Sequence, residues 1–241
     1  MMTDTILKTT KKKIDKTDIL DQIRRQIITM ELMPGEPLDE VEICTKMGIS
    51  RTPLREILIH LSGEGYIQIR ENRGAFVSSM DYHSMRRFFQ TAPMIYAAMS
   101  RLAAENATPY QIDLLAEQQQ HFVKAQHNQS IGGMIYYNDR FHHQIGLIAD
   151  NAFLMPSLKR LLIDHARIGN TFWNDSDDEQ AKRITKASED HDQLIEAIAA
   201  HDAEAAVAIT VDHWQLSKDH IDIFIKPDPI METDGNKDRT A

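Results

Sequence analysis

The sequence predicts a mostly α-helical protein, with an N-terminal winged helix-turn-helix followed by an all-α antiparallel bundle of six or seven helices. Residues 39–77 show the periods of two short helices and a small β-hairpin, whereas residues after about 81 show only helical periods. With 241 residues, 42% of them hydrophobic, the chain can bury a separate core in each of two domains. We expect a flexible arm over 1–16, a first domain over 17–80, a helical domain over 81–226 and a disordered tail over 227–241.

The first predicted helix covers residues 17–31, and Pro34-Gly35 ends it. The next helix begins after Asp39, a capping residue with Glu42 as its expected reciprocal partner. Gly48 follows this helix, where a residue with positive φ is favoured. The apolar residues expected to face inward from these two helices are Leu20, Ile23, Ile27, Met30, Val41, Cys44 and Met47.

The third helix begins with Ser50 as its N-cap and has Pro53 in its first turn. Leu54, Ile57, Leu58 and Leu61 recur at helical spacing and form its inward face. The polar residues of the first turn therefore lie outside, where they suit phosphate and base-edge contacts in a major groove. These residues are Arg51, Thr52 and Arg55.

Two short strands follow, over residues 66–69 and 75–77, with Ile67, Ile69, Ala75 and Val77 alternating inward. A basic turn joins them and forms a wing that can reach a neighbouring minor groove. The turn contains Arg70, Asn72, Arg73 and Gly74. The predicted DNA-binding residues are Ser50, Arg51, Thr52, Arg55, Arg73 and Gly74.

The net charge of −9 argues at first against nucleic acid. Residues 1–80, however, hold 12 Lys/Arg and 12 Asp/Glu, so all the excess acidity lies in the remainder of the chain. The field at the helix-turn-helix is therefore set locally by its own Arg and Lys. One cysteine, and no apolar run near the ~20 residues that span a bilayer, predict a cytoplasmic protein without membrane association.

Helical patterns continue over about 82–106, 109–128, 131–149, 151–173, 178–200 and 202–224, and Pro93 is expected to kink or interrupt the first of them. Three of these helices each place one histidine on an apolar face: His142, His191 and His213. Asn138 lies one turn before His142. Spacing alone favours separate core and surface histidines, but three imidazoles and an amide that converge can also share a metal ion.

The motifs LMPGEPLDE, MGISRTPLREILIHLSGEGYI and NRGAFV closely resemble the N-terminal domain of GntR-family bacterial transcription regulators. Residues 100–108, 138–151 and 189–208 resemble, more loosely, the FCD effector domain of the FadR-like branch of that family. The resemblance implies a homodimer that binds a short pseudo-palindromic operator in double-stranded DNA and responds to a small-molecule effector. It also implies a divalent ion (Zn, Ni or Mn) held by Asn138, His142, His191 and His213.

Two departures from the family pattern affect the effector domain. Asn138 stands where the family more often has Asp, which removes one negative charge from the metal site. Ala92 and Tyr96 stand where acid-binding members carry an Arg and a Glu. The effector is therefore expected to be less acidic, to be bound mainly by the metal, or to be held by Arg87 or Arg101. If the ligand register were shifted by one residue, Asp139 and His143 would replace Asn138 and His142.

Two other functions compete with the regulator. A three-histidine site with an open position is also typical of metal-dependent enzymes, although no general base or nucleophile motif accompanies it and no catalytic residue is predicted. A nucleoid-type structural DNA binder would leave the effector domain without a role.

Overall fold

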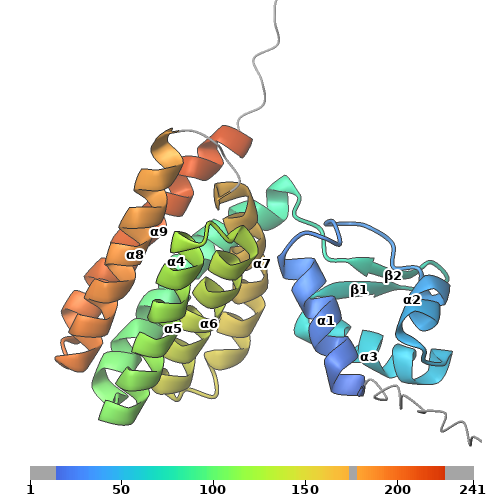
Figure 1. Cartoon of the computed structure of the whole chain (residues 1–241), viewed down its shortest axis with the longest axis horizontal. Coiled ribbons are helices and arrows are strands. Elements are labelled where there is room, and N and C mark those ends of the chain that lie inside the picture. Colours follow the sequence, from blue (N-terminus) through green and yellow to red (C-terminus); the bar gives the residue numbers. More distant parts are fainter. Residues whose placement is uncertain (1–14, 174–177, 226–241) are drawn as a thin grey trace, which may run out of the picture.

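The computed structural model describes residues 15–173 and 178–225, which form two domains lying side by side (Figure 1). A small N-terminal domain, here called the head, is joined to a bundle of longer helices, here called the effector domain. Nearly all of the predicted arm and the whole of the predicted tail lie outside the described residues. Within the described part, no helix is long and apolar enough to cross a membrane.

The head contains α1 (Lys16–Ile28), α2 (Glu40–Met47), α3 (Arg51–Glu64), β1 (Ile67–Arg70) and β2 (Gly74–Val77). The two strands pair antiparallel, with Ile67 opposite Val77 and Arg70 opposite Gly74. Backbone hydrogen bonds of Gly35, Glu36 and Leu38 to β2 add a further extended segment to this sheet. The winged helix-turn-helix predicted from the sequence is therefore confirmed.

Several side chains of the head are buried to a different extent from that predicted by sequence periodicity. Ile19 is buried on α1, whereas Leu20 is only half-buried. Val41 is 59% exposed because α2 is short and packs only through Ile43, Cys44 and Met47. Ile69 is 50% exposed, although its cross-strand partner Ala75 is buried in the head core.

The capping predictions were right for Asp39 and Gly48 but wrong for Glu42, whose carboxylate pairs with Lys46 and makes no hydrogen bond to the Asp39 amide within the described residues. Asp39 accepts hydrogen bonds from the amides of Val41 and Glu42 at 2.9 Å, and Gly48 has φ +65°. Ser50 occupies the N-cap of α3 in an extended conformation but makes no side-chain cap bond. Its hydroxyl is therefore left exposed beside the first turn of α3.

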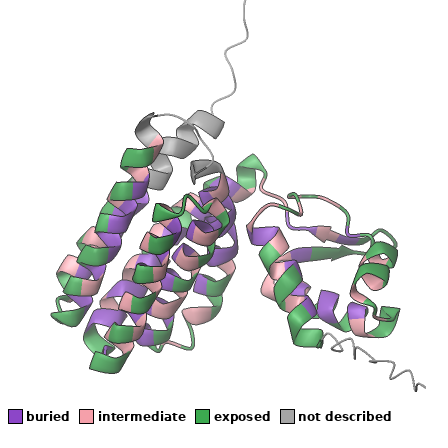
Figure 2. Cartoon of the chain, in the orientation of Figure 1, coloured by how far each residue is buried: buried purple, intermediate pink, exposed green. Residues whose placement is uncertain are grey.

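The described part of the effector domain contains six helices: α4 (Tyr82–Asn106), α5 (Pro109–His127), α6 (Ile131–Ala149), α7 (Met155–Trp173), α8 (Asp178–Ala199) and α9 (Ala203–Ile225). Helix α4 packs against α6, α7 and α9, and α5 packs against α6 and α8. Buried residues follow the inner side of each helix (Figure 2). Pro93 lies within α4 without interrupting it, because Ala92 and Tyr96 beside it are anchored in the core.

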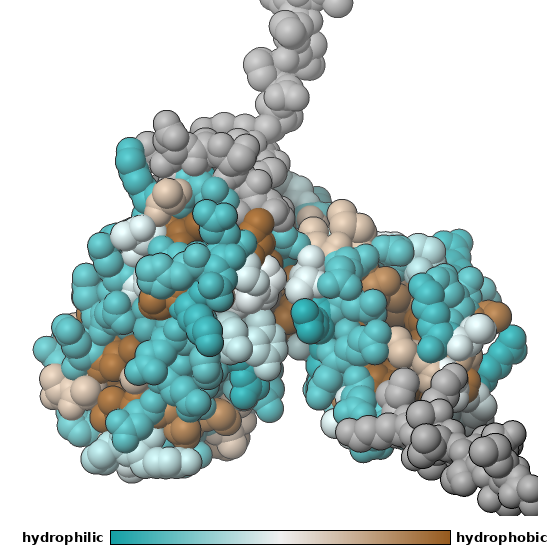
Figure 3. Space-filling model, viewed as in Figure 1, coloured by the Kyte–Doolittle hydropathy of each residue, from teal (hydrophilic) through white to brown (hydrophobic). Residues whose placement is uncertain are grey.

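The head docks on the effector domain through apolar and polar contacts. Ile28 at the end of α1 is 7% exposed and belongs to an effector-domain cluster that includes Phe122 and Ala166. Asn170 on α7 donates to the backbone oxygen of Thr29 at 2.6 Å. Helix α7 therefore contacts both the head and the effector core (Figure 1). In the space-filling view the two domains touch each other (Figure 3).

Arg167 on α7 is fully buried and pairs with Asp164, while its Nη1 donates to the backbone oxygen of Ser78 at 2.6 Å. Replacing it by alanine should lower the free energy of unfolding by about 3 kcal/mol, since Ser78 and part of the Asp164 carboxylate would be buried without a partner. Urea denaturation followed by tryptophan fluorescence measures this. Arg160→Ala removes the half-exposed partner of the same carboxylate and should cost less than about 1 kcal/mol. Equal losses in the two variants would contradict the assignment.

Candidate DNA-binding surface and histidine centre

The first turn of α3 forms an exposed polar surface. Arg51, Thr52 and Arg55 are all exposed, and neither arginine has an ion-pair partner within the part of the chain that the structure describes. The inward face of the same helix is buried through Leu54, Ile57, Leu58 and Leu61, as predicted. This surface therefore offers two unneutralised guanidinium groups and a hydroxyl at a helix N-terminus, a combination that binds phosphate and guanine edges.

The wing adds a second basic element. Asn72 and Gly74 have φ values of +57° and +83°, which fold the chain back between the strands and leave Arg73 exposed at the tip. The guanidinium of Arg70 lies 4.5 Å from the ring centroid of Phe76, so this arginine is held against the sheet. Arg73 is consequently the wing residue with the greatest reach.

The second site lies inside the effector domain, where three helices bring three histidines together. His142 from α6, His191 from α8 and His213 from α9 are buried, and one ring nitrogen of each lies within 4.8 Å of the other two. The Nε2 atoms of His142 and His191 have no hydrogen-bond partner within the described residues. Each such buried nitrogen costs about 1–3 kcal/mol, which a ligand at the centre would recover.

Hydrogen bonds outside this centre orient two of the rings. Gln119 donates its Nε2 to Ser188, and its Oε1 lies 3.0 Å from Nδ1 of His191. Because that oxygen can only accept, His191 carries its proton on Nδ1 and keeps a free lone pair on Nε2. Asp190 lies 3.2 Å from Nδ1 of His213 and fixes that ring in the same way. Such outer partners are typical of metal-ligating histidines.

The electrostatics favour neutral imidazoles. Burial, with smaller effects from neighbouring histidines, holds the pKa of His142 and His191 well below the usual value. Burial alone would raise the pKa of Asp190, but hydrogen bonds from His213 and Lys186 outweigh it and lower this pKa. His142 and His191 therefore present uncharged nitrogen donors, and the Asp190 carboxylate lies behind the centre.

The structure also locates the other predicted site residues. Asn138 is 4% exposed, one helical turn before His142. Asp139 and His143 instead line a cavity between the head and the effector domain, which disfavours the shifted register. Arg87 is exposed, and Arg101 forms an exposed ion pair with Glu204 at 2.8 Å. Neither arginine belongs to the histidine centre.

Sequence reasoning missed His165 on α7. Its ring lies 4.9 Å from that of His142, and its Nδ1 is 3.0 Å from the hydroxyl of Tyr96. Burial lowers its pKa to about 3. The surrounding run LLIDHARI carries apolar residues at helical spacing, a signal that would have predicted a buried histidine. The Tyr96–His165 pair thus stands beside the centre, where an arginine clamp was found to be missing.

Comparison with protein families matches both domains. Residues 89–216 match the FCD domain, and residues 16–77 match the model described as "Bacterial regulatory proteins, gntR family". The Nta operon transcriptional regulator of Aminobacter aminovorans is 26% identical over 197 residues, which cover 80% of this chain and 88% of that protein. The HTH-type transcriptional repressor RspR of Escherichia coli is 30% identical over 142 residues, 58% of this chain and 61% of that one.

Solved structures show the same fold. Escherichia coli McbR/YncC superposes with a TM-score of 0.75 at 18% identity, covering 88% of this chain and 98% of that one. A GntR regulator from Rhodococcus sp. RHA1 gives a TM-score of 0.67 at 18% identity, covering 86% and 96% of the two chains. At these identities the likeness concerns the fold alone.

Proposed function

Because this chain belongs to the GntR family of transcription regulators and carries an FCD effector domain, we propose that it is a ligand-responsive, sequence-specific operator-binding protein that acts as a homodimer. The observation that supports this most directly is the pairing of an exposed, unneutralised arginine pair on α3 with a buried three-histidine centre in the same chain. The arginine pair can bind DNA, and the histidine centre can bind a ligand that alters the conformation of the effector domain.

The DNA contacts are assigned to two elements. Ser50, Arg51, Thr52 and Arg55 on α3 would enter a major groove, and the wing residues Arg73 and Gly74 would meet the adjacent minor groove. One recognition helix reads only a few base pairs, so two copies of the chain would be required for a useful operator length.

The residues at the histidine centre fit a divalent metal. Two orphaned Nε2 atoms, a third histidine held by Asp190 and the buried Asn138 amide form a set of neutral nitrogen and oxygen donors. Imidazole ligands suit Zn and Ni, whereas Mn prefers carboxylates. When bound, the ion would supply an electrophilic centre to which an effector oxygen can coordinate. We expect His142, His191 and His213 to hold it and Gln119 and Asp190 to keep the rings aligned.

An effector bound beside this centre would contact uncharged side chains. Ala92 and Tyr96 are buried where acid-binding relatives are expected to carry charged residues, and Tyr96 is engaged with His165. The Arg87 and Arg101 contacts predicted from the sequence would require both side chains to turn inward from the surface. We therefore expect an effector at this centre to coordinate the ion and to donate hydrogen bonds to uncharged groups or accept them.

The enzyme alternative receives no support from the site. The carboxylate nearest to the three histidines, Asp190, is held by His213 and Lys186 and is not free to act as a general base. The relatives of both domains are transcription regulators.

Selection of bound fragments from a genomic DNA library by the purified full-length chain tests the regulator function. Recovery of a fragment with a short inverted repeat, protected from nuclease cleavage over both half-sites, is the expected result. Sedimentation equilibrium of the same preparation should give twice the chain mass. Uniform binding to all fragments would instead indicate a structural DNA binder, and a monomeric chain would contradict the dimer.

Asn138→Asp should tighten zinc binding about tenfold or more, because it places a negative charge one turn from His142 in a buried site. The same change should destabilise the metal-free protein, since an unpaired buried carboxylate is costly. Competition against a chromophoric chelator measures the affinity. A variant that binds zinc no more tightly than the wild type would show that Asn138 is not a ligand.

A further inference from the structure

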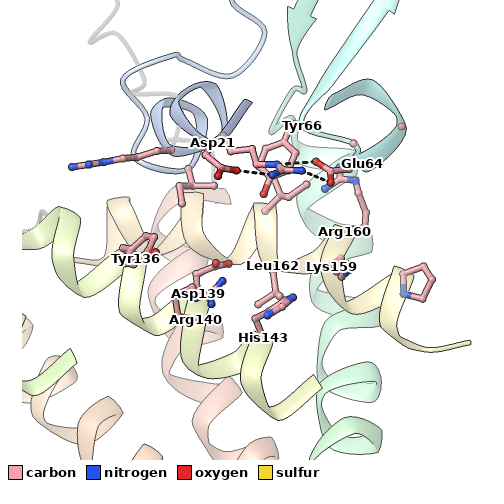
Figure 4. Close-up of a pocket in the computed structure, with 17 residues that line it drawn as sticks. Asp21, Glu64, Tyr66, Tyr136, Asp139, Arg140, His143, Lys159, Arg160 and Leu162 are labelled. Carbon is pink, nitrogen blue, oxygen red and sulfur yellow. Dashed lines mark hydrogen bonds and ion pairs between the residues drawn. The ribbon is translucent and has the colours of Figure 1, made fainter. Parts of the chain in front are cut away.

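A cavity lies between the two domains, and none of the three histidines of the centre lines it. It has a volume of about 740 Å³, within the usual range for small-molecule sites. The head supplies one wall from α1 and the end of α3, and the effector domain supplies the other from α6 and α7 (Figure 4).

Firm contacts on either side fix the width of this cavity. Ile28, which lines it, is buried in the effector-domain cluster that contains Phe122 and Ala166. Arg160 lies so close to the backbone of Gly65 that a Cβ at this position would be 2.5 Å from the Cδ of Arg160. The cavity is therefore already formed in the docked arrangement of the two domains.

Most charges of the head wall are already paired, and Arg25 is the exception among the described residues. Arg24 contacts Asp21 at 2.7 Å and Glu64 at 2.5 Å (Figure 4), so these three side chains form a closed network. The hydroxyl of Tyr66 lies beside this network and has no hydrogen-bond partner within the described residues. It remains available to a ligand.

The effector wall, in contrast, carries charges of both signs without partners. Arg140 and Lys159 form no ion pair, and the half-buried Asp139 carboxylate accepts no hydrogen bond, within the described part of the chain. All three line the cavity, Asp139 and Arg140 from α6 and Lys159 from α7 (Figure 4). The half-buried carboxylate of Asp139 lacks a hydrogen-bond donor, and Arg140 and Lys159 lack an anionic partner, so the polar groups of this wall are only partly satisfied within the described residues.

A ligand that completes this network needs an anionic group for Arg140 and Lys159 and a cationic donor for Asp139. We propose that the interdomain cavity binds a free amino acid, with its carboxylate toward Arg140 and Lys159 and its ammonium toward Asp139. The apolar side chains of Ile28 and Leu162, which also line the cavity, would receive the amino acid's own side chain. Since its two walls belong to different domains, occupancy stabilises the docked position of the head.

The inference goes beyond the proposed function and does not depend on DNA or on metal. The test uses the full-length chain dialysed against a chelator, so that amine coordination to a metal makes no contribution. Each of the twenty common L-amino acids at 10 mM is compared by thermal melting at constant ionic strength and pH 7.5. We expect amino acids with one kind of side chain to raise Tm by about 2–4 °C, and the rise should saturate as their concentration increases.

Calorimetry then compares the strongest binder with the same acid lacking its amino group. The amino acid should bind at least fivefold more tightly, and Asp139→Asn should abolish this preference. Arg140→Ala/Lys159→Ala should weaken both compounds at least tenfold. The control Arg86→Ala/Lys124→Ala removes two exposed charges elsewhere and should change neither.

Three results would overturn the proposal. The first is that none of the twenty amino acids stabilises the chain saturably. The second is that the Arg140/Lys159 double variant binds as tightly as its control. A stabilisation that persists in Asp139→Asn with its amine preference intact would equally show that the ammonium lies elsewhere.

Discussion

Replacing Arg51 and Arg55 together by alanine should weaken operator binding by about 100-fold or more. Each arginine projects from the exposed first turn of α3 and has no ion-pair partner within the described residues, so both are available for DNA. A bidentate arginine–guanine contact contributes about 1–3 kcal/mol, and the two arginines act in each half-site. Fluorescence anisotropy with the selected operator measures the loss at fixed salt.

The fold should not change in this variant, because neither side chain belongs to the buried face formed by Leu54, Ile57, Leu58 and Leu61. Far-UV circular dichroism checks this. Arg86→Ala/Lys124→Ala again provides the matched control for the loss of two positive charges, and it should bind the operator within about twofold of the wild type. If the α3 double variant binds as tightly as that control, α3 does not read the operator.

The head could be predicted in detail because its signals are local. Capping residues, glycines at positive φ and short-range periodicity decide where α2 and α3 begin and end, and Asp39 and Gly48 behave as these rules require. Val41 and Ile69 were misplaced for a different reason. Periodicity identifies a face of an element, but it does not say how far the core extends beneath that face.

The contacts between domains could not be predicted from sequence. Ile28 was not among the residues predicted to face inward from the first helix, yet it is buried in a cluster with residues of α5, α6 and α7. Asp139 and His143 look like an alternative ligand pair because they share the i, i+4 spacing of Asn138 and His142. Only the packing of α6 between the bundle core and the head separates the two faces, placing one pair inward and the other in the interdomain cavity.

The sequence predicted which three histidines face inward, but it did not predict the residues that hydrogen-bond to their rings. Helical spacing identified His142, His191 and His213 as inward-facing, and the structure brings them together. Gln119 lies on α5 and holds a ring of α8, and Asp190 lies on α8 and holds a ring of α9, so no pattern within one helix linked them to these rings. These two hydrogen bonds occupy Nδ1 of His191 and of His213, so the Nε2 atoms of these two rings remain available to a metal.

Removing the proposed metal should lower the melting temperature of the wild-type protein by about 10 °C. A ligand that binds only the folded state at about 1,000 times its Kd stabilises it by about 4 kcal/mol, and each kcal/mol shifts Tm by about 2–4 °C at this size. His191→Ala should lose most of this chelator sensitivity, because the Nε2 of His191 is one of the two orphaned donors.

His143→Ala provides the matched comparison for the metal experiment. It removes an imidazole one residue from His142 that lines the interdomain cavity rather than the centre, so chelator sensitivity should be retained. Elemental analysis of protein purified without chelators should accompany each melting curve. If the wild type carries no stoichiometric metal and gains no stability from added zinc, nickel or manganese, the orphaned nitrogens serve another ligand. Equal chelator sensitivity in His191→Ala and His143→Ala would likewise place any bound ion outside the three-histidine centre.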